Sequence, residues 1–137
     1  EHDRALFMRA EPLLAPDTGS PMSLYQAAEA LDVDRGELEN ALKQVGALGK
    51  LVVIARNRYV PIEYLRNAAQ SAEELARQSP ADGFSVAAYC EKTTIGRNFA
   101  IALLEYFDQK GFTQRSDNNR KIRKSAEEVF EGMQDRP

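Results

Sequence analysis

Hydrophobic residues in the first part of the chain recur at the spacing of amphipathic helices. The pattern predicts a helix over about residues 3–10, a second over 24–31 with Ser23 as its N-cap, and a third that begins after Asp34. The apolar positions of the third helix recur at helical spacing: Leu38, Ala41, Leu42 and Val45.

Two β-rich runs come after the third helix, in the segment KLVVIARNRYVP. They cover residues 50–54 and 58–60, and residues 55–57 between them predict a turn. Helix, turn, helix and β-hairpin is the order of a winged helix, which is a helix-turn-helix with an appended hairpin, or wing. We therefore predict a first winged-helix domain over residues 1–61.

The chain repeats itself at a constant offset of 62 residues, without a gap over about forty positions. The matching pairs include Ser23 with Ser85, Ala28 with Cys90, Arg35 with Arg97, Gly49 with Gly111 and Arg58 with Arg120. Self-similarity at a fixed offset indicates two copies of one structural unit.

The second copy has the same order of elements. Helices are predicted over about 62–78, 86–91 and 95–110, and Thr93 or Thr94 is the predicted cap of the last one. The segments FTQR and RKIR form the second hairpin around the turn SDNN. The predicted inward face of the last helix consists of Phe99, Ile101 or Ala102, Leu103, Tyr106 and Phe107.

The fold class is therefore mainly α with small β-hairpins (α+β), as two tandem winged-helix domains over 1–61 and 62–137.

A hydrophobic fraction of 43% in 137 residues is typical of a soluble globular protein. No apolar run has the length of a membrane span, and nothing at the start resembles a signal peptide. A single cysteine favours a reducing compartment, so we expect a cytoplasmic location. Because the chain opens on Glu-His rather than Met, we expect it to be part of a longer protein.

Charge is distributed unevenly along the chain, although the net charge is only −3. Residues 1–91 carry 9 basic and 14 acidic side chains, a net of −5. Residues 92–124 carry 8 basic and 3 acidic side chains, a net of +5, and residues 125–137 return to −3. An asymmetry of this kind indicates a surface that binds a polyanion.

Few residues could support catalysis. The one histidine, His2, lies at the terminus of the chain, where we expect fraying, and Cys90 falls on a predicted buried face, where packing is the expected role. One Cys and one His cannot form a structural zinc site, and GALGKL lacks the spacing of a phosphate-binding loop. We expect no enzyme activity, no metal and no cofactor.

The start of the last predicted helix, TTIGRNFA, is one candidate binding site. Its exposed positions are Thr94, Gly96, Arg97 and Asn98. Backbone N–H groups at a helix start bind phosphate, and Gly96 would permit close approach. Arg97 offers a bidentate fork, and Asn98 offers a donor and an acceptor for base edges.

The second wing is the stronger candidate because the first wing, in the equivalent stretch, carries only Arg56 and Arg58. The candidate residues of the second wing are Arg115, Asn118, Asn119, Arg120, Lys121, Arg123 and Lys124. A charged hairpin edge also protects a protein against aggregation, so charge alone does not establish binding. Its position in the same unit as Arg97 favours contact with nucleic acid.

The first unit is predicted to be a spacer or a protein contact, because Asp34, Glu37 and Glu39 would repel phosphate at its helix start. Two alternatives to RNA binding stay open at this point: a DNA-binding winged-helix regulator and a tandem winged-helix protein-interaction module. The last helix has Glu105 and Asp108 and no basic residue between Asn98 and Lys110, which favours a compact RNA hairpin over a long insertion into a DNA groove.

The segment FSVAAYCEKTTIGRNFAIALLEYFDQKGFTQRSDNNRKI, residues 84–122, resembles the last winged-helix domain of the bacterial selenocysteine-specific elongation factors, the SelB family. The resemblance is carried by FSVAA, by IGRNFAIALLEYFD and by the entry GFT-R into the wing. The preceding unit is similar to the penultimate winged helix of that family.

The resemblance implies a partner and a role. In the SelB family the last winged helix binds the mRNA hairpin of the selenocysteine insertion element, beside an in-frame UGA codon, and tethers the factor near the ribosome. GTP and selenocysteinyl-tRNA bind to other domains of the factor. By position, Arg97 and Asn98 would face the RNA, and the basic residues of the wing would line it. We expect a monomer without a membrane contact.

Overall fold

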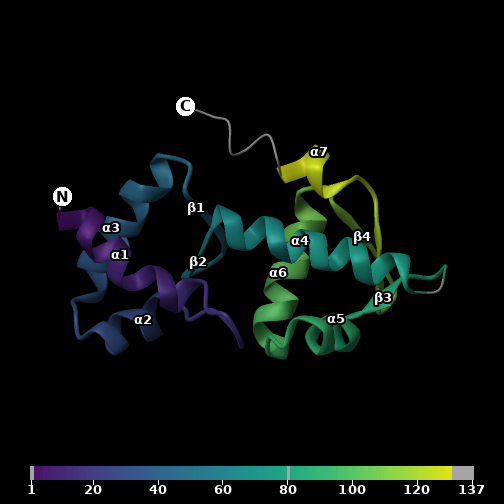
Figure 1. The fold of residues 1–137 in the computed structure, drawn as a ribbon, viewed down its shortest axis with the longest axis horizontal. Coiled ribbons are helices and arrows are strands. Elements are labelled where there is room, and N and C mark those ends of the chain that lie inside the picture. The colour runs from purple at the N-terminus through teal and green to yellow at the C-terminus, as the bar shows by residue number, and fades with distance from the viewer. Residues whose placement is uncertain (1, 80, 131–137) are drawn as a thin grey trace.

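The computed structural model describes residues 2–79 and 81–130 of the chain. The first unit contains α1 (His2–Leu14), α2 (Leu24–Leu31), α3 (Arg35–Ala47), β1 (Leu51–Ala55) and β2 (Arg58–Pro61). The second contains α4 (Ile62–Arg77), β3 (Phe84–Ser85), α5 (Val86–Thr93), α6 (Arg97–Gln109), β4 (Thr113–Ser116) and β5 (Asn119–Ile122), and α7 (Ala126–Phe130) follows. Figure 1 shows the two units side by side along the long axis of the molecule. Within the described ranges, no helix is long and apolar enough to cross a membrane.

The repeat in the sequence is a repeat in the structure. Both ends of α5 lie 62 residues after those of α2, and the same holds for α6 and α3. Ser23 Oγ accepts a hydrogen bond from the Gln26 amide at 3.2 Å, and Ser85 Oγ accepts one from the Ala88 amide at 3.1 Å. Each serine satisfies an amide that has no partner within its helix, so the same local signal starts both helices.

The start of α6 differs from the prediction. Thr94 is the C-cap of α5, in the left-handed conformation at φ 63°, and does not cap α6. Gly96 is the N-cap, so α6 begins at Arg97. Thr94 belongs to the turn between the helices because its amide donates to the carbonyl of Cys90 at 2.8 Å.

The buried face of α6 also needs a correction. Phe99, Leu103, Tyr106 and Phe107 are buried as predicted, but the fifth position was assigned to Ile101 or Ala102, which are only half-buried. Ala100 and Leu104 are fully buried instead. The buried face of α6 is therefore wider than predicted, because other elements of the second unit pack against the helix from several sides.

The β1–β2 hairpin contributes to both hydrophobic cores. Leu51 and Tyr59 pack in the first core, with α1, α2 and α3. Ile54 and Val60 pack in the second core, with α4, α5 and α6. The hairpin lies between the two units in Figure 1, and α4 follows it directly. The division of the chain at residue 61 stays a prediction, because this hairpin is packed in both cores.

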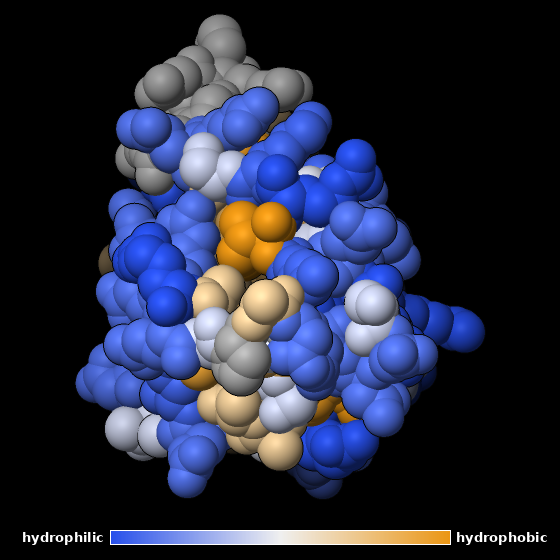
Figure 2. Space-filling view, turned by 90° about the vertical axis from the view of Figure 1, so that its right-hand side faces the viewer, coloured by the Kyte–Doolittle hydropathy of each residue, from blue (hydrophilic) through white to orange (hydrophobic). Residues whose placement is uncertain are grey.

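The second unit has a third strand, β3, that the sequence analysis missed. It pairs with β5 in the strand order β3-β5-β4. Gly83 precedes it at φ +99°, where an added Cβ would clash with the backbone carbonyl of Arg120, so the close approach requires glycine. A strand of two residues is too short to show alternation. Figure 2 shows this end of the molecule, where hydrophilic side chains predominate.

An aromatic cluster closes the second core beneath α7. The ring of Phe130 lies 5.5 Å from that of Phe107 and 5.2 Å from that of Phe112, centroid to centroid. The amide of Ala126, at the start of α7, donates to the carboxylate of Glu73 on α4 at 2.6 Å. Edge-to-face aromatic contacts of this kind stabilise a core beyond the area they bury.

A buried ion pair attaches the second wing to α6. Arg120 on β5 is 3% exposed, and its guanidinium donates to both carboxylate oxygens of Asp108 on α6, with its Nη2 3.0 Å from Oδ2. Thr113 on β4 donates its hydroxyl to Oδ1 of the same carboxylate at 2.6 Å. Asp108 therefore fixes both strands of the hairpin relative to the helix.

We expect Asp108→Ala to destabilise the protein by about 3 kcal/mol, because it leaves the Arg120 guanidinium buried without a counterion. Asp108→Asn, which keeps an acceptor for Thr113, should cost less. Urea unfolding measures both effects as a lower midpoint at an unchanged slope. An Asp108→Ala midpoint equal to that of the wild type would contradict the role given to this ion pair.

Candidate nucleic-acid interface

The start of α6 presents polar groups on a rigidly packed helix. Arg97 and Asn98 are exposed in its first turn, whereas Phe99 beside them is 2% exposed and anchors the helix in the core. Gly96 provides no side-chain acceptor at the N-cap. The amides of the first turn therefore have no capping side chain, which is the arrangement that binds anions.

The second wing is a tight hairpin beside this helix start. Asp117 lies at its turn in the left-handed conformation, at φ 56°. Arg115 Nε donates to the carbonyl of Asp117 at 3.0 Å, which holds the exposed arginine close to the turn. Asn118 is exposed at the tip.

A groove of about 380 Å³ brings the helix start and the wing together. Arg97 from α6, Arg115 from β4 and Asn118 from the turn all line it. Its other lining residues are Ser85, Val86, Ala87, Ile101, Glu105 and Arg120. The groove thus combines two cationic forks, an amide and apolar side chains, and could hold a nucleobase beside a phosphate.

Two of the predicted contact residues have internal partners. The Arg120 guanidinium is buried and paired with Asp108, so it is not available as an exposed phosphate ligand. The Gly96 amide donates to Ser20 Oγ in the first unit at 2.7 Å, and a Cβ at Gly96 would lie 3.2 Å from the same oxygen. Glycine at this position makes room for Ser20. We therefore withdraw Arg120 from the set of direct contacts. Gly96 is exposed, and its contact with a ligand stays a prediction.

The remaining predicted residues are spread around the wing. Arg115 pairs with Arg120 across the hairpin and Gln114 pairs with Lys121, so Lys121 projects from the opposite face. Lys121 is exposed there, in a hollow that it shares with Glu73 and Arg77. Half-buried Asn119 pairs in strand register with Ser85 and Ser116.

The last basic residues lie at the base of the wing. Lys124 lines a hollow together with Lys110 and with Val52 and Val53 of β1. It therefore lies at the opposite end of the hairpin from the turn. Arg123 is exposed, and its amide donates to the carbonyl of Phe112 at 2.8 Å. Thr94 is exposed in the turn before α6. These three residues do not line the groove, which brings together only part of the predicted set.

Sequence reasoning missed five residues that line the groove: Ser85, Val86, Ala87, Ile101 and Glu105. Val86 and Ala87 come from the start of α5, and Ile101 was assigned to the buried face of α6. Glu105 had been read only as an obstacle to DNA, yet it stands in the groove with the two arginines. Its helical spacing of eight residues from Arg97 is the signal that places both on one side of α6.

The equivalent helix start in the first unit is capped by a side chain. Asp34 caps α3, and its Oδ2 accepts from the Glu37 amide at 3.0 Å. A carboxylate already occupies the position that a phosphate would take, which agrees with the predicted repulsion.

Ser20 and Arg58 of the first unit hold the start of α6. Besides the Ser20–Gly96 hydrogen bond, the guanidinium of Arg58 lies 5.5 Å from the centroid of the Phe99 ring. Arg58 also donates to the carbonyl of Pro21 at 3.3 Å, which ties the Ser20 loop to the same point. The ring of Tyr64 on α4 contacts that of Phe99 edge-on, with 6.2 Å between the ring centroids. Burial raises the pKa of Tyr64 to about 12, so its phenol is neutral near pH 7.

The chain is similar in sequence to proteins of one known family. Residues 77–122 match the family model described as "Elongation factor SelB, winged helix". The curated selenocysteine-specific elongation factors of Escherichia coli K12 and Haemophilus influenzae Rd are similar to the chain, at 28% identity over 90% of it and 30% over 77% of it. The chain spans only 19% and 17% of the length of these relatives.

A solved structure is similar over nearly the whole chain. It is the mRNA-binding domain of elongation factor SelB from E. coli in complex with SECIS RNA, with a TM-score of 0.75 and 27% identity. The similarity covers 90% of this chain and 98% of that one. The predicted fold class, two tandem winged helices, is confirmed. The chain belongs to the SelB family of selenocysteine-specific elongation factors and corresponds to its C-terminal winged-helix region.

Proposed function

We propose that this chain is the mRNA-binding module of a selenocysteine-specific elongation factor. It recognises the hairpin of a selenocysteine insertion element and tethers the factor beside a UGA codon at the ribosome, in the cytoplasm. The module itself carries out no reaction. The whole factor would bind GTP and selenocysteinyl-tRNA through other domains.

The observation that carries this proposal is the convergence of Arg97, Arg115 and Asn118 on one groove. These side chains come from a helix start and a hairpin that Asp108 and Arg120 hold together. Recognition of an RNA hairpin requires cations for the backbone and a shaped site for an unstacked base. The groove supplies both, and the E. coli domain in complex with SECIS RNA has the same fold.

The chemistry of the groove suggests a division of roles. Arg97, beside the uncapped amides of α6, is placed to bind a phosphate. Asn118 and Arg115 face an apolar surface formed by Val86 and Ile101, against which a base can pack. Glu105 would repel a phosphate from that end of the groove and accept a hydrogen bond from a base.

A DNA-binding regulator fits the same surface poorly. A recognition helix in a major groove presents several polar or basic side chains along its length. Beyond Arg97 and Asn98, the exposed positions of α6 include Glu105 and Gln109 and no basic residue. Contact limited to the helix start and the wing favours a compact RNA fold.

Removal of Arg97 should weaken binding to a synthetic selenocysteine insertion hairpin about tenfold, because a charge-assisted contact is lost. The salt dependence should become shallower by about 0.7–0.9 in log K per log salt for Arg97→Ala, and Arg115→Ala should act similarly. Fluorescence titration at several salt concentrations measures both quantities.

The matched control is Arg56→Ala, which removes the same charge from an exposed position in the first hairpin. Equal losses for Arg56→Ala and Arg97→Ala would show that binding depends on net charge alone and not on the groove. Arg120→Ala is unsuitable as a test, because it breaks the ion pair with Asp108.

Glu105→Gln should raise affinity about twofold to fivefold for RNA hairpins of any sequence, since it removes a negative charge beside two arginines. Discrimination between the insertion hairpin and a hairpin without unpaired bases should decrease. Glu91→Gln, at an exposed position outside the groove, is the control. If the two variants behave alike, Glu105 has no role in selectivity.

Ser20→Ala should weaken hairpin binding about threefold, because it removes the acceptor that holds the Gly96 amide at the start of α6. The salt dependence should not change, since no phosphate ligand is lost. Ser20→Thr should restore affinity, and Thr18→Ala, in the same loop, serves as control. An unchanged affinity for Ser20→Ala would mean that the first unit does not position α6 for RNA.

A further inference from the structure

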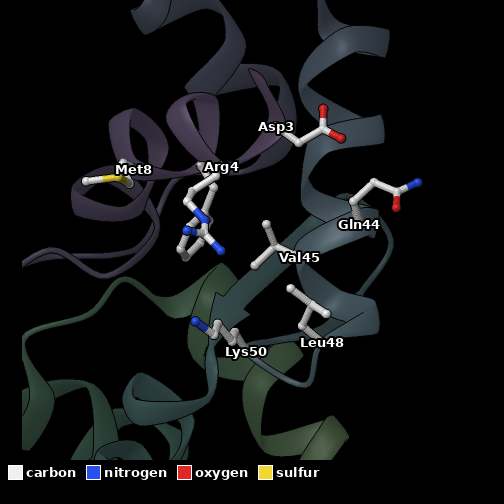
Figure 3. A pocket seen from close by; sticks show the side chains of 8 residues that line it. Asp3, Arg4, Met8, Gln44, Val45, Leu48 and Lys50 are labelled. Carbon is white, nitrogen blue, oxygen red and sulfur yellow. The ribbon is translucent and has the colours of Figure 1, made fainter. Parts of the chain in front are cut away.

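The first unit has an open groove of about 490 Å³ between α1 and the end of α3. It is lined by Asp3, Arg4, Phe7, Met8, Gln44, Val45, Leu48 and Lys50. In Figure 3 the nitrogen ends of Arg4 and Lys50 lie on one side of this groove, and the apolar side chains of Val45 and Leu48 lie on the other. Met8 and Leu48 are 65% and 62% exposed, which is unusual for large apolar side chains.

The corresponding surface of the second unit is covered. At the offset of 62 residues, Val45 corresponds to Phe107 and Lys50 to Phe112. Both phenylalanines are fully buried, and each packs against Phe130 of α7. The groove of the first unit is therefore the equivalent of the site in which α7 lies.

The path of the chain explains why only one of the two grooves is filled. After the second wing the chain turns back as α7, and the amide of Ala126 donates to Glu73. After the first wing it enters α4 directly, so the residues equivalent to α7, 64–68, belong to a helix of the second unit. Within residues 2–79 and 81–130, no helix equivalent to α7 therefore lies over this surface of the first unit.

We propose that this groove binds a short acidic amphipathic helix that carries an aromatic anchor, supplied by a partner protein. The chemistry is that of α7, in which Ala126 and Phe130 are buried and Glu127 and Glu128 are exposed. The anchor would pack between Phe7 and Val45, as Phe130 packs on Phe107.

Two features of the first unit suit such a helix. Arg4 and Lys50, which line the groove, supply positive charge for its acidic face. Beyond the groove, Glu11 is exposed on α1 at the position equivalent to Glu73, which accepts the first amide of α7. Helix-in-groove recognition uses the same elements, namely apolar anchors at helical spacing and a polar rim. None of these residues lines the RNA groove, so the two sites can be occupied together.

The test uses the whole chain and a synthetic peptide with the sequence of residues 125–137, SAEEVFEGMQDRP. NMR titration should shift the signals of Met8, Val45 and Leu48 and give a dissociation constant of about 1 mM, since a short unstructured peptide must order on binding. A Phe130→Ala peptide should not bind, and Leu48→Lys in the protein should abolish the shifts. Tyr25→Lys, at another exposed apolar position, should bind the peptide normally.

Several results would overturn the proposal. The absence of shifts at 2 mM peptide, in a protein that otherwise gives a folded spectrum, is one of them. Equal binding of the Phe130→Ala peptide, or shifts confined to α6 and the surroundings of α7, is another. A wild-type dimer in sedimentation that Leu48→Lys dissociates would make a second copy the occupant. RNA affinity of Leu48→Lys should equal that of the wild type, which separates this proposal from the proposed function.

Discussion

Burial of the β1–β2 hairpin between the two units is the constraint on which the rest of the structure depends. Because Leu51 and Tyr59 face one core and Ile54 and Val60 face the other, the first wing cannot be a free, charged hairpin. Its low charge is a consequence of this burial. The contrast in charge between the two wings therefore carries less information about a ligand than the sequence suggested, and the case for RNA rests instead on the groove that Arg97 and Arg115 share.

The fold was largely predictable because its signals are local. Serine caps, helical periodicity and the 62-residue offset depend on residues close in sequence or on simple self-comparison, and the structure has the elements they predicted. The role of Gly96 was not predictable, since its partner Ser20 lies 76 residues away. Arg120 was assigned to the exposed surface for the same reason. The sequence does not distinguish an exposed arginine from a buried one, and only the packed hairpin shows that Asp108 already neutralises the Arg120 side chain.

Duplication followed by small changes gives the two units different capacities. At the start of α3 a carboxylate from Asp34 caps the helix, whereas at the start of α6 a glycine leaves the amides without a side-chain cap. Beneath the end of α6 the phenylalanines are covered by α7, whereas the equivalent surface at the end of α3 is open. A few side chains at corresponding positions thus decide which surface can meet an anion and which can meet an apolar partner.

Rigidity accounts for how so few cations could serve a specific interface. Asp108 fixes the wing relative to α6, and Ser20 and Arg58 fix the start of α6 relative to the first unit. The two elements that carry the groove-lining arginines are thereby held in a fixed arrangement before any ligand arrives, so less conformational entropy is lost on binding. A flexible basic tail of equal charge would attract any polyanion equally well. Selectivity in this protein must therefore come from the geometry that the largely buried first wing maintains.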